Sequence, residues 1–452
     1  MGLTATLCER MAGLGYADMP AEALGAARRL VLDGLAVGVA GVSEEDAVPI
    51  MARVLRDLGG APLSTVIGQG FRIDPVRAAA LNGAAMHVLD FEPMWSPATH
   101  ALSVTLPAAL ALAEARGLPG REVLAALVKG IEIQGWLREA SGQYTPDVLQ
   151  FHPPGLVGPM GSAAVAAHLL QLDPGRMANA LGIAASRAGS VFGNVGTMTK
   201  SNHCGQAAAL GLEAALLAEA GFTGDTGTFE SPLGYAGSFF KGTFKPEEML
   251  GYGRPPWRVV SPGYAIKMFP SQFGTHFGIT AALELHPRIP SADAIRGVTL
   301  TGPVMPYVNR PDPETGLSGK FSLQYTMASA LLDGHVGIHT FTDRRLHAPD
   351  MRALLPKVTL VMDKDIPARF ETMHVRLRVE LADGSVLETR CDGPRGMWGR
   401  PPIDPADHLR KVRDCLSTRL SDSAIDQVIE LGGRIDTLDD VGALMALVGG
   451  NA

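Results

Sequence analysis

The chain has 452 residues, of which 46% are hydrophobic and 19% charged, and its formal net charge is −7. A chain of this length exceeds one ordinary hydrophobic core, so two domains are expected. The negative charge, which no cluster of Lys and Arg offsets, argues against a nucleic-acid-binding surface. No run of about 18 uncharged apolar residues predicts a membrane span.

The cysteines and the N-terminal sequence bear on the compartment. Cys8, Cys204, Cys391 and Cys415 are dispersed without a C-x-x-C pair, as expected of reduced thiols in a cytoplasmic protein. The first residues contain no basic region followed by an apolar one, so no secretory signal is expected. We therefore expect a cytoplasmic protein with neither a disulfide framework nor a zinc ribbon.

The first half of the chain has helical periodicity. Helices are predicted over residues 76–89, 102–115, 123–134, 161–172 and 176–187, and an earlier one places Leu24, Ala27, Val31 and Leu35 on one face. Residues 251–263 contain three prolines and three glycines, which indicates a boundary. The part before this boundary is predicted to be all-α.

Beyond residue 263 the apolar residues recur with period two. Strands are predicted over residues 298–301, 358–361 and 373–381, and Asp383-Gly384 indicates a hairpin after the last of them. Helices predicted over residues 273–285 and 323–332 are interleaved with these strands, so this part is expected to be α+β.

The last fifty residues return to helical periodicity. Asp404 is predicted to cap a helix from Pro405 to about Leu416, and Ser423 to open another that runs to about Leu431. We expect these helices to rejoin the helical body. The predicted fold is therefore mostly α: a discontinuous all-α domain, residues 1–255 and 402–452, with an inserted α+β lid domain, residues 256–401.

Residues 90–100, DFEPMWSPATH, place two carboxylates and an imidazole between two predicted helices. Pro93 and Pro97 prevent a continuous helix, so Asp90 ends one helix and His100 lies near the start of the next. A helix N-terminus carries free N–H groups and positive partial charge, which favour an anion beside His100. Taken alone, the segment fits a surface turn with Asp and Thr caps equally well.

Three further side chains have patterns typical of a site. His152 lies in a turn, FHPPG, before a helix rich in Gly and Ala, where a surface cap is the alternative. A Gly/Thr loop delivers Lys200 and His203 to a helix start. A lysine and a histidine placed in this way suit a carboxylate, and a solvated loop is the alternative.

Two candidates lie beyond the boundary. Lys267 stands in an apolar stretch, where a cation needs an anion unless its side chain reaches solvent. Tyr325 lies at the head of a predicted helix, where a buried tyrosine with a satisfied hydroxyl is the alternative to an acid.

Several common sites are not indicated. The sequence has no G-x-G-x-x-G after a strand, no phosphate-binding G-x-x-x-x-G-K-[ST] and no G-x-S-x-G, so dinucleotide-binding, P-loop and hydrolase folds are disfavoured. His335 and His339 have a spacing that suits a metal on a helix. Neighbouring glycines disfavour a helix there, and we expect no metal site.

Taken in order over residues 10–440, these motifs resemble the MmgE/PrpD family. The motifs are Asp90-Phe91 with Ala-Thr-His100, Phe151-His152, Gly-Thr-Met-Thr-Lys200 with His203, Lys267-x-Phe-Pro270, and Tyr325. Members of that family dehydrate 2-methylcitrate, decarboxylate cis-aconitate or epimerise iminodisuccinate. The resemblance implies a helical domain with an α+β lid, a homodimer, a small di- or tricarboxylate substrate, and no required metal or organic cofactor.

The resemblance also implies the site residues, which would line a cleft between the domains. The implied catalytic residues are Asp90, His100, His152 and Tyr325, and the implied substrate-binding residues are Lys200, His203, Lys267 and Gln272. Two departures concern the substrate. Glu92-Pro93-Met94 stands where members have a second acidic pair and a threonine, so a hydroxyl donor is lost and the pocket is less polar. Gln272 stands where the decarboxylases have a histidine.

The expected activity is a cofactor-independent lyase of the 2-methylcitrate dehydratase type, which abstracts a proton next to a carboxylate and releases water. His152, or His100 oriented by Asp90, is the expected base. The lysines would stabilise the resulting dianion, and Tyr325 or the other histidine would be the acid. The alternatives are epimerisation or decarboxylation on the same scaffold, and a non-catalytic carboxylate-binding protein.

Overall fold

The computed structural model describes residues 2–144 and 148–450, and the chain divides into two compact units. Unit 1 comprises residues 2–144, Val148–Ile266 and 404–450, and unit 2 comprises Lys267–Ile403. Unit 1 is thus discontinuous in sequence. The boundaries predicted from the sequence, 255/256 and 401/402, fall before those of the units, 266/267 and 403/404.

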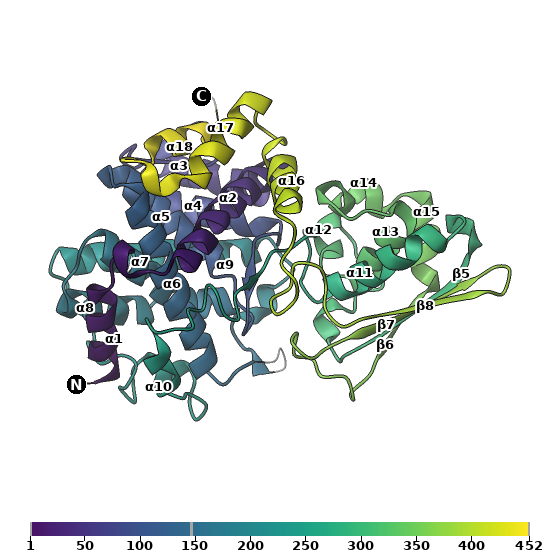
Figure 1. The fold of residues 1–452 in the computed structure, drawn as a ribbon, viewed down its shortest axis with the longest axis horizontal. Helices are drawn as coiled ribbons and strands as arrows, with labels where there is room; N and C mark the ends of the chain where they lie inside the picture. Colours follow the sequence, from purple (N-terminus) through teal and green to yellow (C-terminus); the bar gives the residue numbers. More distant parts are fainter. Residues whose placement is uncertain (1, 145–147, 451–452) are drawn as a thin grey trace. The chain divides into compact units, whose positions relative to one another are not determined.

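Unit 1 is helical (Figure 1), and the prediction of a mostly α protein is confirmed. Its helices are α1 (Leu3–Gly13), α2 (Ala21–Glu44), α3 (Ala47–Asp57), α4 (Pro75–Val88), α5 (Leu102–Arg116), α6 (Gly120–Ala140), α7 (Pro153–Leu169), α8 (Pro174–Ala185), α9 (Thr199–Glu219), α10 (Tyr235–Phe239), α16 (Pro405–Leu416), α17 (Asp422–Gly433) and α18 (Gly442–Val448). Two short antiparallel pairs join β1 (Ser64–Thr65) to β2 (Arg72–Ile73) and β3 (Met94–Trp95) to β4 (Tyr264–Ala265).

The centre of unit 1 is formed by helices that are buried on all sides. In α4 every residue from Ala78 to Val88 is buried, and in α5 every residue from Leu102 to Ala113. Both α4 and α7 pack against α5 and α9. Small residues permit this contact: a Cβ on Gly205 of α9 would lie 2.2 Å from the carbonyl oxygen of Ala80 in α4. A helix that is apolar all round belongs in such a core.

The C-terminal helices return to unit 1, where α16 and α17 pack against α2 (Figure 1). Helix α16 has the predicted bounds, and Asp404 caps it by accepting a 2.8 Å hydrogen bond from the amide of Ala406. Helix α17 is capped by Ser421, two residues before the predicted Ser423.

Unit 2 contains a four-stranded sheet of order β6-β5-β7-β8, formed by β5 (Ile295–Gly302), β6 (Val358–Met362), β7 (Val375–Leu381) and β8 (Val386–Cys391). β5 and β6 are parallel, and the other pairs are antiparallel. Helices α11 (Thr275–Leu285) and α13 (Leu323–Asp333) cover one face of the sheet (Figure 1). Three short helices complete the unit: α12 (Gly316–Gly319), α14 (Asp343–Leu346) and α15 (Pro349–Leu354).

Three further sequence expectations concern the cysteines, a membrane span and a hairpin. The four cysteines are free and buried. Within residues 2–144 and 148–450, none of the helices combines the length and the apolar character that crossing a bilayer requires. The predicted hairpin at Asp383-Gly384 joins β7 to β8.

Candidate functional site

The predicted site residues of unit 1 lie at the ends of the four central helices. Asp90 follows α4, His100 lies two residues before α5, His152 directly precedes α7, and Lys200 is the second residue of α9. All four side chains are buried, with at most 8% exposure. The N-termini of α5, α7 and α9 carry free N–H groups and positive partial charge, which favour an anion near these residues.

The ammonium of Lys200 links two of these ends. Its Nζ donates a 2.8 Å hydrogen bond to Oδ2 of Asp90 and lies 2.9 Å from Nε2 of His87. Nδ1 of His87 contacts Oε1 of Glu92, and Nδ1 of His100 lies 2.9 Å from the same oxygen. Glu92 therefore lies between two imidazoles, one of which contacts the lysine.

These contacts fix the protonation of His87. Because an ammonium only donates, Nε2 of His87 is an acceptor, and its ring proton is on Nδ1, facing the Glu92 carboxylate. His87 is neutral in this arrangement. Burial lowers its pKa to about 4, although the Glu92 carboxylate opposes the shift.

Two more imidazoles lie beside this group. Nδ1 of His203 lies 3.3 Å from Nδ1 of His152. The ring centroid of His152 lies 5.6 Å from that of His87 and 6.1 Å from that of His100. Four histidine rings thus lie next to one another, and that of His87 contacts the ammonium. We refer to His87, Asp90, Glu92, His100, His152, Lys200 and His203 as the His/Lys cluster.

Burial and positive charge keep His152 and His203 neutral as well. The pKa of His152 is held well below its usual value, first by burial and then by the Lys200 ammonium. The same two causes lower the pKa of His203 to about 4. At pH 7 each of these imidazoles is therefore neutral and has one unprotonated ring nitrogen.

Several polar atoms of the 90–100 loop have no partner. Among the described residues, Oε2 of Glu92, Nε1 of Trp95 and Oγ1 of Thr99 are buried and form no hydrogen bond. Buried polar groups are normally paired, so such a concentration indicates a ligand site. Burial alone would raise the pKa of Glu92, but the imidazoles of His87 and His100 hold it well below its usual value, and the side chain is a carboxylate.

The predicted orientation of His100 by Asp90 differs from the structure. Nε2 of His100 lies 4.0 Å from Oδ1 of Asp90, whereas Glu92 is 2.9 Å away on the other ring nitrogen. The difference arises because Asp90 is engaged by Lys200. Glu92 is the carboxylate closest to the His100 ring.

Sequence reasoning missed His87 and gave Glu92 no role. The sequence places His87 in a predicted helix of small buried residues. The available signal is its chemistry: a histidine in an otherwise apolar stretch, three residues before Asp90. Glu92 stands out in the sequence as a departure from the family pattern, yet it is fully buried and contacts two histidines.

Two predicted substrate-binding residues belong to unit 2. Lys267 is fully buried, and its Nζ donates a 3.0 Å hydrogen bond to the carbonyl of Ser271. The amide of Gln272 donates to the Tyr307 hydroxyl and accepts from the backbone N–H of Gly274. Their roles toward a substrate stay predictions.

Tyr325 also lies in unit 2, in the first turn of α13. It is fully buried, and its hydroxyl donates to the carbonyl of Thr340. Burial raises the pKa of Tyr325 to about 12. These contacts match a core tyrosine with a satisfied hydroxyl, and the role of Tyr325 as an acid stays a prediction.

Within residues 2–144 and 148–450, two sets of residues have the chemistry and spacing for a metal ion. They are His87, His100 and His152, and Asp90, Glu92 and His100, whose ligand atoms lie within 4.8 Å of one another. Both ring nitrogens of His87 already contact protein groups, Lys200 and Glu92. An ion on His87 would have to displace one of them, so the first set fits a metal poorly.

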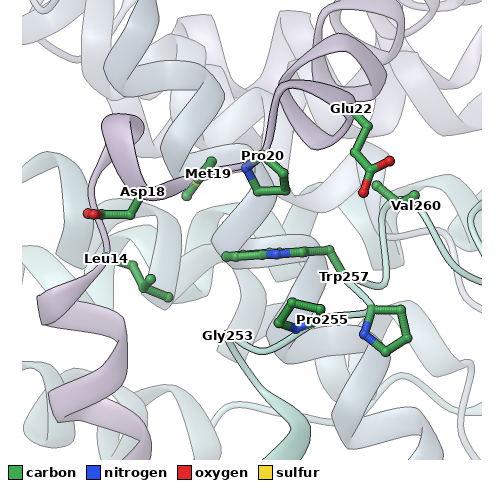
Figure 2. A pocket seen from close by; sticks show the side chains of 10 residues that line it. Leu14, Asp18, Met19, Pro20, Glu22, Gly253, Pro255, Trp257 and Val260 are labelled. Atoms are coloured by element: carbon green, nitrogen blue, oxygen red, sulfur yellow. The ribbon is translucent and has the colours of Figure 1, made fainter.

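A separate pocket of unit 1 has a different character (Figure 2). Its lining residues are Leu14, Asp18, Met19, Pro20, Glu22, Gly253, Pro255, Pro256, Trp257 and Val260. Figure 2 shows the Trp257 ring between Pro20 and Pro255. The titratable side chains in this lining are two carboxylates, Asp18 and Glu22, which would repel an acidic molecule. The pocket shares no residue with the His/Lys cluster.

The fold and the cluster define a mostly helical protein with a buried group of imidazoles, carboxylates and one ammonium. The model of the MmgE/PrpD N-terminal domain matches residues 5–247, and that of the MmgE/PrpD C-terminal domain matches residues 269–432. The chain therefore belongs to the MmgE/PrpD family. The resemblance noted in the sequence is confirmed.

Curated relatives of this chain are lyases. Cis-aconitate decarboxylase of Mus musculus is 34% identical over 437 residues, which cover 94% of this chain and 88% of that protein. Cis-aconitate decarboxylase of Homo sapiens is 32% identical, with coverages of 99% and 95%. 2-Methylcitrate dehydratase of Cupriavidus necator is 26% identical, with coverages of 80% and 79%. The chain is accordingly an enzyme of the lyase type.

Proposed function

We propose that this enzyme decarboxylates a small unsaturated tricarboxylate of the cis-aconitate class and needs no organic cofactor. The sequence alone favours dehydration and leaves decarboxylation open. Two relatives that are more than 30% identical over nearly the whole chain are decarboxylases, whereas the dehydratases are less similar. This difference supports decarboxylation.

The observation that carries the proposal is the position of the Lys200 ammonium. It is buried and contacts both Asp90 and His87, and the rings of His100 and His152 lie beside that of His87. When a C–C bond to a carboxylate breaks and carbon dioxide leaves, the electron pair stays on the substrate. In an allylic acid it spreads through the double bond toward a second carboxylate. A fixed cation in a dry site stabilises that charge.

The reaction also consumes one proton, which must reach the carbon skeleton. His152 is the proposed donor, since its ring lies among the cluster imidazoles and beside His203. In the protein without substrate His152 is neutral, because burial and the Lys200 ammonium disfavour its charged form. The negative charge of a trianionic substrate would raise the pKa of His152 again. Substrate binding would thus protonate the imidazole, which then supplies the proton that the product needs.

Dehydration is the second candidate, and the protonation states of the histidines favour it. Neutral His152 and His203 are already in the form that a base needs to abstract a proton next to a carboxylate. Gln272, which stands where the decarboxylases have a histidine, points in the same direction. In this reaction a second group would protonate the departing hydroxyl.

The test is incubation of the purified protein in deuterium oxide with cis-aconitate, 2-methylcitrate, citrate and iminodisuccinate, followed by NMR. The expected result is carbon dioxide release from cis-aconitate and a five-carbon dicarboxylate that carries deuterium at the protonated carbon. Water loss from 2-methylcitrate without reaction of cis-aconitate would overturn the proposal in favour of dehydration.

Two further outcomes would also overturn the proposal. Deuterium exchange or inversion of iminodisuccinate alone would indicate an epimerase, and calorimetric binding without any chemical change would indicate a carboxylate-binding protein.

We further propose a cytoplasmic homodimer. Light scattering on the eluting protein tests the dimer, because a monomer of 47.5 kDa and its dimer differ twofold in mass.

A further inference from the structure

The 90–100 loop is held by three buried cations that do not belong to the His/Lys cluster. Lys411 donates a 2.8 Å hydrogen bond to the carbonyl of Phe91, Arg258 a 2.7 Å bond to that of Ser96, and Arg138 a 3.2 Å bond to that of Ala98. All three side chains are buried in unit 1. Each of these charged side chains therefore donates a hydrogen bond to a backbone carbonyl of the loop.

Of the three, Lys411 holds the point closest to the cluster. Phe91 lies between Asp90 and Glu92, and its carbonyl belongs to the peptide that precedes Glu92. The Lys411 ammonium also lies 4.2 Å from the centroid of the Phe91 ring, where a cation is attracted to the aromatic face. One side chain thus fixes both the backbone and the ring of the residue between the two carboxylates.

The backbone at this point needs such a restraint. Asp90 has a φ of +51°, in the left-handed region that residues other than glycine rarely adopt. A small rotation there would turn the Asp90 carboxylate away from Lys200. The contact between Glu92 and His87 depends in turn on the orientation of the peptide that joins Phe91 to Glu92.

Lys411 is itself anchored from α2. Its Nζ lies 3.0 Å and 2.9 Å from the two carboxylate oxygens of Asp33, and Nε2 of His408 lies 3.0 Å from the same carboxylate. Asp33 is fully buried. Lys411 therefore joins α16 to the 90–100 loop by a hydrogen bond and to α2 by a buried ion pair, which the proposed reaction does not use.

We infer that Lys411 is a positioning residue, which acts through the Phe91 carbonyl to hold Asp90 and Glu92 in their contacts with Lys200 and His87. The part of this inference that concerns turnover rests on the proposed function. The part that concerns the geometry of the cluster does not. The two parts are tested by separate measurements.

The test variant is Lys411→Met combined with Asp33→Asn. Replacement of Lys411 alone would leave the Asp33 carboxylate buried without its ammonium and could unfold the protein, whereas the pair of changes removes both charges. The matched control is Arg413→Met, an exposed cation on the same helix that pairs with Asp426. Lys411→Arg, which retains charge and donors, is the conservative variant.

The first measurement is independent of turnover: the NMR signals of ring-15N-labelled histidines in the full chain without ligand, assigned through single His→Gln variants. The signals of His87 and His100 are expected to shift in the double variant and to stay in place in Arg413→Met. A double variant with the unchanged histidine spectrum would overturn the inference, whatever the enzyme's substrate is.

The second measurement is turnover of cis-aconitate. The double variant is expected to lose kcat by about a hundredfold with KM changed less than about threefold, because misplaced groups slow the chemical step more than they weaken binding. Lys411→Arg should recover part of this loss. Unchanged kcat in the double variant overturns the part of the inference that concerns turnover. Absence of turnover by the unsubstituted enzyme contradicts the proposed function, and the histidine spectra still decide the role of Lys411.

Discussion

Lys200 and Asp90 form a buried ion pair at 2.8 Å although they lie 110 residues apart in the chain. The pair joins the end of α4 to the start of α9, two helices in close contact. His87 shares the same ammonium through its Nε2. The cluster therefore depends on how these two helices pack, and on the charge of one lysine.

Replacement of that lysine is expected to abolish most of the activity. Lys200→Met should lower kcat/KM by about a hundredfold to a thousandfold, the loss typical of removing one group that stabilises developing negative charge. Steady-state kinetics with the substrate found in the panel measure it, with circular dichroism to check folding. Lys241→Met, at an exposed lysine of the same unit, is the control. Retention of most of the activity in Lys200→Met would exclude the lysine from the reaction.

The pH dependence of kcat/KM distinguishes decarboxylation from dehydration. His152 is neutral before substrate binds and would carry a proton in the decarboxylating complex, so substrate binding must take up a proton. Under that mechanism kcat/KM falls as pH rises from about 6 to about 8, by up to about tenfold per pH unit, because one proton is taken up.

A reaction that uses a neutral histidine as its base would not show this fall in kcat/KM. His203, whose pKa is about 4, stays deprotonated across the same pH window, so kcat/KM of a dehydratase that uses it would not fall as pH rises through the window. Calorimetry of binding in buffers of different ionisation enthalpy measures the proton uptake directly. Binding without proton uptake contradicts the role of His152 as donor.

Stability is expected to fall in acid because of histidines that are largely buried in neutral form. His168 is an example outside the cluster: Nζ of Lys129 lies 2.8 Å from its Nδ1, its Nε2 faces Glu122, and burial lowers its pKa to about 3. In the unfolded chain its pKa is about 6.5. Between these values the unfolded state binds more protons, so stability is lost as pH falls from about 6.5 toward about 3.

The contribution of His168 can be measured by substitution. From about pH 7 to about pH 5, His168 should cost the unsubstituted protein about 2 kcal/mol of unfolding free energy, at about 1.4 kcal/mol per pH unit below about 6.5. Urea unfolding of His168→Gln should show a loss that is smaller by this amount. His335→Gln, at an exposed histidine, should show the unchanged loss. Equal pH dependence in all three proteins would mean that folding does not lower the pKa of His168.

The helices and strands could be predicted because their signals are local. Asp404 followed by Pro405 marks the start of α16, and Asp383-Gly384 marks the turn between β7 and β8, since a cap and a tight turn are each specified by two or three residues. The predicted start of α7 is too late. The prolines that follow His152 suggest a turn, yet the helix begins at Pro153 because prolines are tolerated in the first turn.

The pairing within the site could not be predicted in the same way. Residue types and motifs identify Asp90, His100, His152 and Lys200, but which carboxylate meets which cation is decided by the contact of α4 with α9. That contact depends on small residues spread over two distant segments. His87 escapes notice for the same reason, because its helical neighbours are apolar and its partners lie in other segments.

Gly205 lies in the contact between α4 and α9, where the two helices are closely packed. A Cβ on Gly205 would lie 2.2 Å from the Ala80 carbonyl oxygen and 3.1 Å from the Ala84 nitrogen, so Gly205→Ala must push the two helices apart. The expected loss is about 1–3 kcal/mol of unfolding free energy, typical of overpacking in a core. Since α4 carries His87 and α9 carries Lys200, turnover should fall as well.

Gly25 in α2 provides the matched control. Nothing lies within 4 Å of a Cβ built on it, so Gly25→Ala removes only backbone freedom from a helix. This change should stabilise the protein by up to about 1 kcal/mol and leave turnover unchanged. Urea unfolding of the two variants is thus expected to shift in opposite directions. A Gly205→Ala variant that is as stable and as active as Gly25→Ala would show that close contact between α4 and α9 does not hold Lys200 against His87.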